Sequence, residues 1–421
     1  MDRQKKRILL TIMVVAFIQM PGLALTPGIN QIKTTAFSEY SLGAVQTALA
    51  FSALAQPVAA FTAALLINRR LVTKKAVIVF GLFLLAATGL LALVMNTEFV
   101  HLIMLSIMLG IATGLFISNM FGLIFDNFDP VERQSVVGWQ TSVINAGGII
   151  MSLMGGLLAR YMWYGGYIML LVGLPAAILA IIAVPGKQER AQETQAEAKA
   201  EVEAEAEAEA KAEAKKKMSG RTAKDRLNPR IFYYCGAASL FMMTYSVCGS
   251  NLSTHIAGIG GTATAGIAIA IQMGGGVVSG LFFSKLSKRA GDYSLSFALC
   301  AVFAGYMLLS LFASSLALVF ISVFIVGMAL SIMLPRCIFM VSTLSADKPA
   351  TATATALVSV VSPSVGIFLS PIIITNLTTA LFGESTSARY RFTGVLVLAA
   401  AIIIAATTAW RGRASQPVES E

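Results

Sequence analysis

The chain has 421 residues, of which 57% are hydrophobic and 12% are charged, and its formal net charge is +10. This balance excludes a water-soluble globular protein, which needs more polar surface. The apolar residues form long unbroken runs without the alternation of membrane β-strands, so the sequence predicts an all-α membrane protein rather than a transmembrane β-barrel.

Twelve apolar runs follow one another along the chain. Each is long enough to cross a bilayer, which takes about 20 residues. We expect membrane spans at roughly residues 8–29, 41–67, 76–95, 99–125, 135–158, 161–184, 231–255, 262–284, 293–313, 316–342, 350–376 and 392–410. The four cysteines lie within these runs and lack metal-ligand spacing, so we interpret them as small apolar residues and expect neither a metal site nor a cofactor.

Basic residues are distributed unevenly between the two sides that these spans define. With a cytoplasmic N-terminus, 26 of the 31 Lys and Arg residues fall in cytoplasmic segments, and only Lys33, Arg160, Arg389 and Arg391 fall in outer loops. Cytoplasmic loops of membrane proteins carry this excess. We therefore expect a multi-pass protein of the bacterial cytoplasmic membrane with both termini in the cytoplasm, and the net charge needs no nucleic-acid partner to explain it.

The segment 186–230 separates the first six spans from the last six. The sequence therefore predicts an N-terminal bundle over 1–185, a linker over 186–230 and a C-terminal bundle over 231–421. The linker is a low-complexity run of Glu, Ala and Lys that favours helix but has no apolar face with which to dock. We interpret it as a partly helical, solvated tether; a regulatory or partner-binding role is the alternative.

The two halves carry related sequences at the same place. The segment Gly110–Asn119 in the fourth span aligns with Gly327–Arg336 in the tenth, with small residues that permit close helix contact and a polar residue at the end. Two six-helix repeats related by an axis along the membrane normal form a known transporter architecture. The sequence thus predicts two pseudo-symmetric six-helix bundles.

A loop motif is repeated in degraded form in both halves. It has the pattern Gly-x-x-x-Asp-Arg-x-Gly-Arg-Arg, and its copies comprise Asn68, Arg69 and Arg70 in the first half and Gly280, Ser284, Lys285, Lys288 and Arg289 in the second. In this motif and in its two halves, the chain resembles the major facilitator superfamily (MFS). The resemblance implies a gating role for these residues. Asn68 and Ser284 replace the family's relay aspartate, which makes that charge relay doubtful here, and ordinary basic loop residues are the alternative.

A second resemblance lies in the fourth and fifth spans. Asp126 and Arg133 are followed by Gly138, Gly147 and Gly155, a spacing similar to that of the family's drug/proton antiporters. The resemblance implies a conformational role for these residues. The Gly-Pro pair of the antiporters is Met-Ser at 151–152, so antiport is not implied, and close helix packing is the alternative role of the glycines.

Polar side chains near the middle of several spans are candidates for a substrate cavity. They are Gln19, Gln56, Asn145, Tyr245 and Gln272. An unpaired amide in hydrocarbon is expensive, so each should face protein or water. The alternative is a hydrogen bond that only holds two helices together.

Arg336 is the one charged residue that falls inside an apolar run, and Asn119 is its counterpart in the repeat. Every acidic residue can be placed outside the spans, so we expect Arg336 to have no buried carboxylate partner. A lone cation in a membrane usually faces a bundle interior or a water-filled path. Binding of an anionic substrate is our interpretation, and snorkelling of the long side chain to the interface is the alternative.

These features predict a secondary transporter that moves a small organic solute by alternating access, with an organic anion as the preferred class. Efflux of lipophilic compounds is the first alternative, and a non-transporting membrane sensor is the second. No phosphate-binding Gly-x-x-x-x-Gly-Lys motif supports ATP-driven transport, and no catalytic cluster indicates an enzyme. The expected partners are the small-molecule substrate, the lipid bilayer and a coupling ion or counter-substrate, without nucleic acid, for a protein that acts as a monomer.

Overall fold

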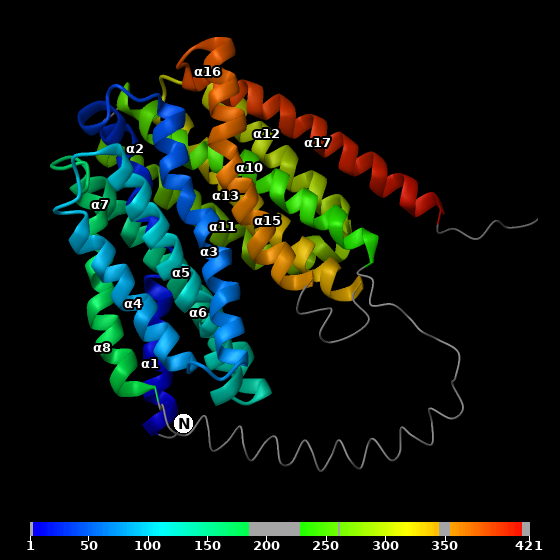
Figure 1. The fold of residues 1–421 in the computed structure, drawn as a ribbon. Coiled ribbons are helices and arrows are strands. Elements are labelled where there is room, and N and C mark those ends of the chain that lie inside the picture. Colours follow the sequence, from blue (N-terminus) through cyan, green and yellow to red (C-terminus); the bar gives the residue numbers. More distant parts are fainter. Residues whose placement is uncertain (1–2, 185–227, 260–261, 345–353, 415–421) are drawn as a thin grey trace, which may run out of the picture.

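The computed structural model describes residues 3–184, 228–259, 262–344 and 354–414 (Figure 1). These residues contain 11 helices long and apolar enough to cross a membrane, and a bent pair, Gln4–Phe17 with Pro21–Ala36, raises the number to 12 if the pair is one span. The predicted all-α fold with twelve spans is therefore confirmed. The linker predicted at 186–230 lies almost wholly outside the described residues.

The first half begins with a broken span. Its helix α1 (Arg3–Phe17) is followed by four short pieces, η1 (Pro21–Ala24), η2 (Thr26–Gly28), α2 (Ile29–Gln31) and η3 (Ile32–Ala36). Pro21 and Pro27 sit in the first turns of η1 and η2, where the missing N–H of proline interrupts a continuous helix. The remaining elements are α3 (Leu42–Asn68), α4 (Lys74–Leu91), α5 (Phe99–Asn127), α6 (Pro130–Leu158), α7 (Gly165–Ile168), η4 (Met169–Val172) and α8 (Gly173–Ala183).

The second half repeats the arrangement with a different broken span. Its elements are α10 (Pro229–Ala257), α11 (Thr262–Ala290), α12 (Tyr293–Leu311), α13 (Leu316–Leu344), η5 (Leu357–Val361), α15 (Ser362–Ser370), η6 (Pro371–Thr375), α16 (Asn376–Phe382) and α17 (Thr386–Ala414). The eleventh span is the irregular one, with Pro363 and Pro371 at the starts of α15 and η6.

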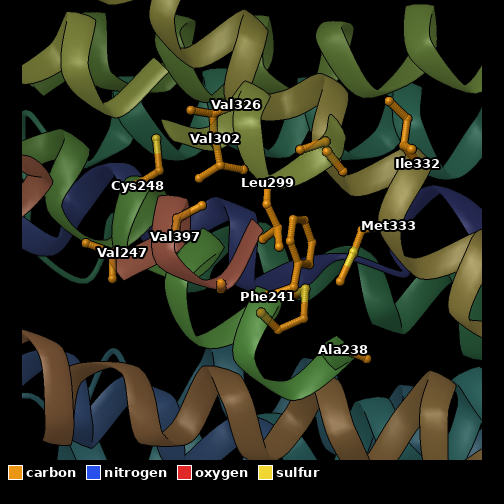
Figure 2. Close-up of a cluster of buried hydrophobic side chains, with 14 of the residues drawn as sticks. Ala238, Phe241, Val247, Cys248, Leu299, Val302, Val326, Ile332, Met333 and Val397 are labelled. Carbon is orange, nitrogen blue, oxygen red and sulfur yellow. The ribbon is translucent and has the colours of Figure 1, made fainter. Parts of the chain in front are cut away.

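Each half has a hydrophobic core of its own. One core is built from residues between Ile8 and Val184 and the other from residues between Ile231 and Ile404. In the second core, Phe241 of α10 packs with Leu299 of α12 and Met333 of α13 (Figure 2). The outward faces carry many exposed large apolar side chains, which suit contact with lipid rather than water.

Glycines set the same helix contact in both halves. A Cβ atom added to Gly110 of α5 would collide with the carbonyl oxygen of Ser52 in α3, and one added to Gly327 of α13 would collide with that of Gln272 in α11. The fourth span thus packs on the second as the tenth packs on the eighth. The aligned segments therefore occupy equivalent positions in the two halves.

The halves approach most closely at one end of the bundle. We call the end of the bundle at which α1 begins, near the N label, the terminal end, and the end that holds α2 and α16 the distal end (Figure 1). Near the distal end α6 and α11 cross through two glycines, where a Cβ on Gly156 would lie 3.0 Å from the Cα of Gly266. Helix α3 also packs against α15 and η6. These contacts place any space between the halves beneath the distal end.

We predict that Gly110→Ala and Gly327→Ala each lower stability by about 1–3 kcal/mol, because the added methyl group overpacks a helix contact. The measurement is thermal unfolding of the purified protein in detergent. Gly236→Ala in α10 is the control, since a Cβ there meets nothing within 4 Å. Equal melting temperatures for all three variants would contradict the close helix contact.

Candidate functional site

A cavity of ≈ 400 Å³ lies between the two halves. The first half contributes the broken first span and α3, and the second half contributes mainly α10 and α11. The volume falls in the range of roughly 300–1,000 Å³ that small-molecule sites occupy. Most of the wall is apolar, and three flexible methionines, Met20, Met242 and Met273, are part of it.

Few polar groups of the wall are available to a solute. The hydroxyl groups of Thr26, Ser52, Ser246 and Ser250 donate to backbone carbonyls of their own segments, at 2.8–3.5 Å. The larger polar side chains of the wall are Gln46, Tyr245 and Gln272. The residues that line the cavity in the described chain include no Asp, Glu, Lys, Arg or His.

Two of the predicted substrate residues, Tyr245 and Gln272, lie together in this wall. Tyr245 of α10 stacks on Phe241, with ring centroids 5.4 Å apart, and this contact orients its ring. Gln272 of α11 lines the same cavity and is 5% exposed. Gln46 is a site residue that the sequence analysis missed, because it lies in the second turn of α3 rather than at mid-span.

The other predicted amides do not line the cavity. Asn119 and Asn145 each donate to a carbonyl one turn earlier in their own helix, at Leu115 and Thr141. Gln19 follows the end of α1, and its buried Oε1 has no hydrogen-bond partner among the described residues. Gln56 lies in α3, with its backbone carbonyl against Gly114 of α5. A role for these four in substrate binding stays a prediction.

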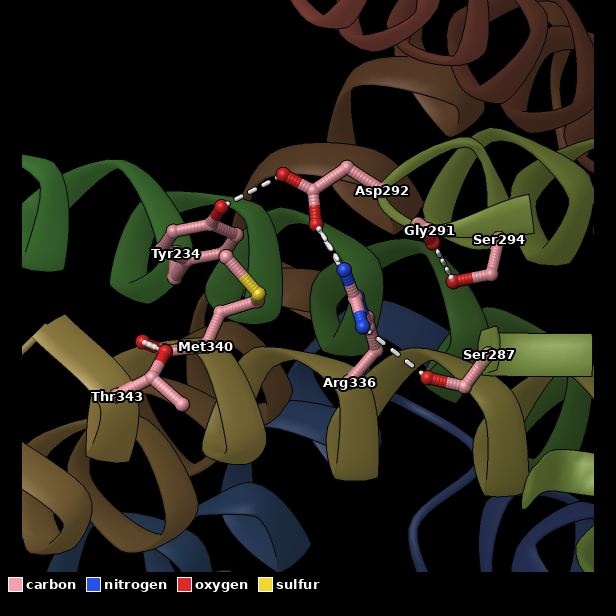
Figure 3. A network of polar contacts seen from close by, with 8 residues as sticks. All are labelled: Tyr234, Ser287, Gly291, Asp292, Ser294, Arg336, Met340 and Thr343. Carbon is pink, nitrogen blue, oxygen red and sulfur yellow. Dashed lines mark hydrogen bonds and ion pairs between the residues drawn. The ribbon is translucent and has the colours of Figure 1, made fainter. Parts of the chain in front are cut away.

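The expectation that Arg336 has no carboxylate partner is wrong. Its Nε and Nη2 atoms donate to Asp292 Oδ1 at 3.1 and 2.9 Å, and its Nη1 atom donates to Ser287 Oγ at 3.1 Å (Figure 3). The Tyr234 hydroxyl donates to the other carboxylate oxygen of Asp292 at 2.7 Å. Asp292 lies outside the apolar runs, at the N-cap of α12, but the fold brings it to Arg336. Arg336 is therefore ion-paired, and it does not line the cavity.

This network joins three parts of the second half at the terminal end. Tyr234 comes from the first turns of α10, Ser287 and Asp292 from the end of α11 and the start of α12, and Arg336 from α13. Asp292 thus bonds Arg336 of the tenth span. It follows the degraded loop motif, which ends at Arg289, and does not occupy the aspartate position within that motif. Because every member belongs to one half, the network stabilises that half and does not join the halves.

A second ion pair joins α1 to α6 in the first half. Lys5 Nζ donates to Glu132 Oε2 at 2.9 Å and to Asp129 Oδ2 at 3.4 Å. The hydrogen bond from Lys5 lowers the pKa of Glu132, and the backbone N–H of Asp129 acts in the same direction. Both partners are about one-third exposed, so we expect the pair to contribute little to stability.

Some of the predicted gating residues form close helix contacts, and others lie on the surface. Gly147 and Gly155 of α6 pack on the carbonyl groups of Phe17 and Ala24, so both glycines form close contacts with the first span. Asn68, Arg69 and Arg70 form the exposed end of α3, and Gly280, Lys285 and Arg289 lie on α11 with exposed surfaces. The side chains of Asp126, Arg133, Ser284 and Lys288, and the surroundings of Gly138, lie outside the described part of the structure.

Comparison with known proteins supplies a family and a fold. The family model described as Major Facilitator Superfamily matches residues 7–371. The solved structure of the nucleoside transporter NupG superposes with a TM-score of 0.70 at 11% identity, covering 99% of this chain and 100% of that one. A bacterial homolog of the human lysosomal transporter Spinster, inward-facing and occupied, gives 0.71 at 15% identity, covering 98% of each chain. A POT family transporter in complex with 5-aminolevulinic acid gives 0.69 at 12% identity, covering 94% of this chain and 95% of that one. A comparison with curated proteins gives no match.

We predict that Arg336→Gln and Asp292→Asn each lower stability by about 1–3 kcal/mol. Each leaves one partly buried charge without its partner, and full burial would make the loss larger. The double variant should recover part of the loss, because it leaves neither charge behind. Thermal unfolding of the four proteins measures this cycle. An Arg336→Gln variant of unchanged stability that lost solute binding would contradict the assignment of Arg336 to an internal ion pair.

Proposed function

The chain belongs to the Major Facilitator Superfamily, and from this premise we propose that it carries a small, uncharged and largely apolar organic solute across the membrane by alternating access. The observation that carries the proposal is the cavity between the halves, whose described wall holds no residue that is charged at neutral pH. A solute in this cavity would contact both halves at once, as alternating access requires.

The chemistry of the wall favours a neutral solute for an energetic reason. A charged group that leaves water for an apolar site without a counter-charge loses several kcal/mol of solvation. An uncharged solute avoids this loss and gains from burial of its apolar surface. Tyr245 and Gln272 can hydrogen-bond one polar group of the solute, and Met20, Met242 and Met273 can adapt to its shape.

The preferred substrate class of the sequence analysis, an organic anion, rested on an unpaired Arg336. Arg336 is instead bonded to Asp292 and lies away from the cavity wall. The proposal therefore follows the first alternative, transport of lipophilic compounds. We also propose, from the distribution of basic residues, that both termini are cytoplasmic in a bacterial cytoplasmic membrane and that the distal end faces outward.

If solute transport is coupled to the movement of a proton, the group that binds the proton would lie outside the cavity. The wall offers no carboxylate or histidine that could exchange a proton with the solute. We propose that a coupling ion or counter-substrate, if the cycle uses one, does not bind to an ionisable side chain of the wall.

A matched series of compounds tests the proposal. Each set contains one apolar skeleton with an amide, a carboxylate or an ammonium group, and binding is measured as the rise in melting temperature of the purified protein. We expect the amides to bind at least about tenfold more tightly than their charged relatives, which corresponds to about 1.4 kcal/mol. Uptake into proteoliposomes should follow the same order.

Tighter binding of the charged compounds than of the amides would overturn the assignment of an uncharged solute. If the carboxylates bind most tightly, the organic anion returns as the substrate class. Binding by Arg336→Gln then tells whether that residue receives the anion.

A further inference from the structure

Arg389 is a fully buried cation near the distal end, with an exposed fraction of 0%. The apolar pattern predicts that Arg389 lies in an outer loop, and this prediction is wrong. Arg389 lies near the start of α17 and points into the bundle. Its guanidinium donates to Asn251 Oδ1 at 2.6 Å, to Thr378 Oγ1 at 3.1 Å and to Thr379 Oγ1 at 2.8 Å. All three acceptors are neutral.

Asn251 of α10 connects this cation to the other half of the molecule. Its Oδ1 atom accepts from Arg389 and also from Gln46 Nε2, at 3.0 Å. Its Nδ2 atom donates to the carbonyl of Val247 at 2.9 Å and to Ser250 Oγ at 3.2 Å. Asn251 is 0% exposed, so its amide has no water with which to replace a lost partner.

The bonded residues form a cluster that we call the Gln46 cluster: Gln46, Ser250, Asn251, Thr375, Thr378, Thr379 and Arg389. Among the described residues of this cluster, Gln46 alone comes from the first half. Its Nε2 atom also donates to the carbonyl of Ser250 at 2.8 Å, and its Oε1 atom accepts from the Thr375 hydroxyl at 2.8 Å. Three groups of the second half thus hold one side chain of the first half. The same side chain forms part of the cavity wall.

The charge of Arg389 reinforces the orientation of the Asn251 amide, which the bond from its Nδ2 atom to the carbonyl of Val247 also favours. A hydrogen bond from an ionised donor is roughly twice as strong as a neutral one. It therefore keeps the carbonyl oxygen of Asn251 at the point where Arg389 and Gln46 meet. Without this charge only neutral hydrogen bonds hold that orientation. If the amide rotated, its NH₂ group would meet the NH₂ group of Gln46, two donors without an acceptor.

We propose that Arg389 is a positioning residue that acts through Asn251 to hold Gln46 in the orientation that closes the distal end of the cavity. Opening of that end breaks the bonds of Gln46, while the bond between Asn251 and Arg389 stays within the second half and keeps the acceptor ready for closure. The inference rests on the proposed function in one respect, since it takes the cavity as the solute site.

The test follows access to the distal end with a cysteine reporter. Ser253 of α10 is fully buried, and its Oγ atom accepts from the backbone N–H of Asn30 in the first half at 3.2 Å. Ser253→Cys, made after replacement of the four native cysteines, should react with a membrane-impermeant maleimide only when the distal end opens. The rate is measured in proteoliposomes without solute, so the result does not depend on the charge of the solute.

We expect Arg389→Gln and Asn251→Leu to raise the labelling rate about fivefold or more, and Arg389→Lys to restore part of the slow rate because an ammonium can still bond Asn251. Arg391→Gln is the matched control. Arg391 lies on the same helix but donates to Ser310, outside the cluster, and its replacement should leave the rate unchanged. Arg389→Gln that labels at the control rate would overturn the proposal.

A second comparison separates positioning from a general structural role. Gln46→Leu should raise the rate by itself, and adding Arg389→Gln should raise it little further, because both changes act on one contact. Independent effects that multiply would contradict the proposal. If Arg389→Gln does not fold, Asn251→Leu alone carries the test, since it keeps Arg389 bonded to Thr378 and Thr379, and an unchanged rate then overturns the proposal.

Discussion

A polar group inside a membrane protein must find its partner within the protein, because lipid offers none. This constraint explains how the two buried arginines of the second half are arranged. Arg336 is paired with Asp292 at the terminal end, and Arg389 is bonded to Asn251 near the distal end. With both cations already partnered, the wall of the central cavity is left without charge.

The Arg336 network and the Gln46 cluster have different positions in the fold. The Arg336 network lies wholly in the second half, where it links α10, α12 and α13 to one another. The Gln46 cluster crosses between the halves, as do the glycine contact of α6 with α11 and the bond from Asn30 to Ser253. A transporter that alternates needs both kinds of contact, since the first kind is kept through the cycle and the second is broken and remade.

Local patterns in the sequence predicted the fold well. Span length and hydrophobicity located the twelve spans, and the small residues around Gly110 and Gly327 located equivalent helix contacts. The site was predicted less well, since only Tyr245 and Gln272 of the proposed substrate residues lie in the cavity wall. The errors at Arg336 and Arg389 share a physical cause. Arg336 bonds Asp292 and Arg389 bonds Asn251, in each case a partner from a distant part of the sequence. Asp292 and Arg389 also lie near span ends, where apolar runs do not show which side chains turn inward.

Insertion of a charge into the cavity wall tests the central claim most directly. Gln272→Glu would place one carboxylate in the cavity wall. Binding of the matched amide, carboxylate and ammonium compounds would be compared with that of the wild type. Asn145→Asp is the control, because Asn145 lies outside the wall. The account predicts that Gln272→Glu shifts the preference from the amide to the ammonium compound, whereas the control keeps the wild-type order. An unchanged preference in Gln272→Glu would contradict the assignment of this uncharged cavity as the solute site.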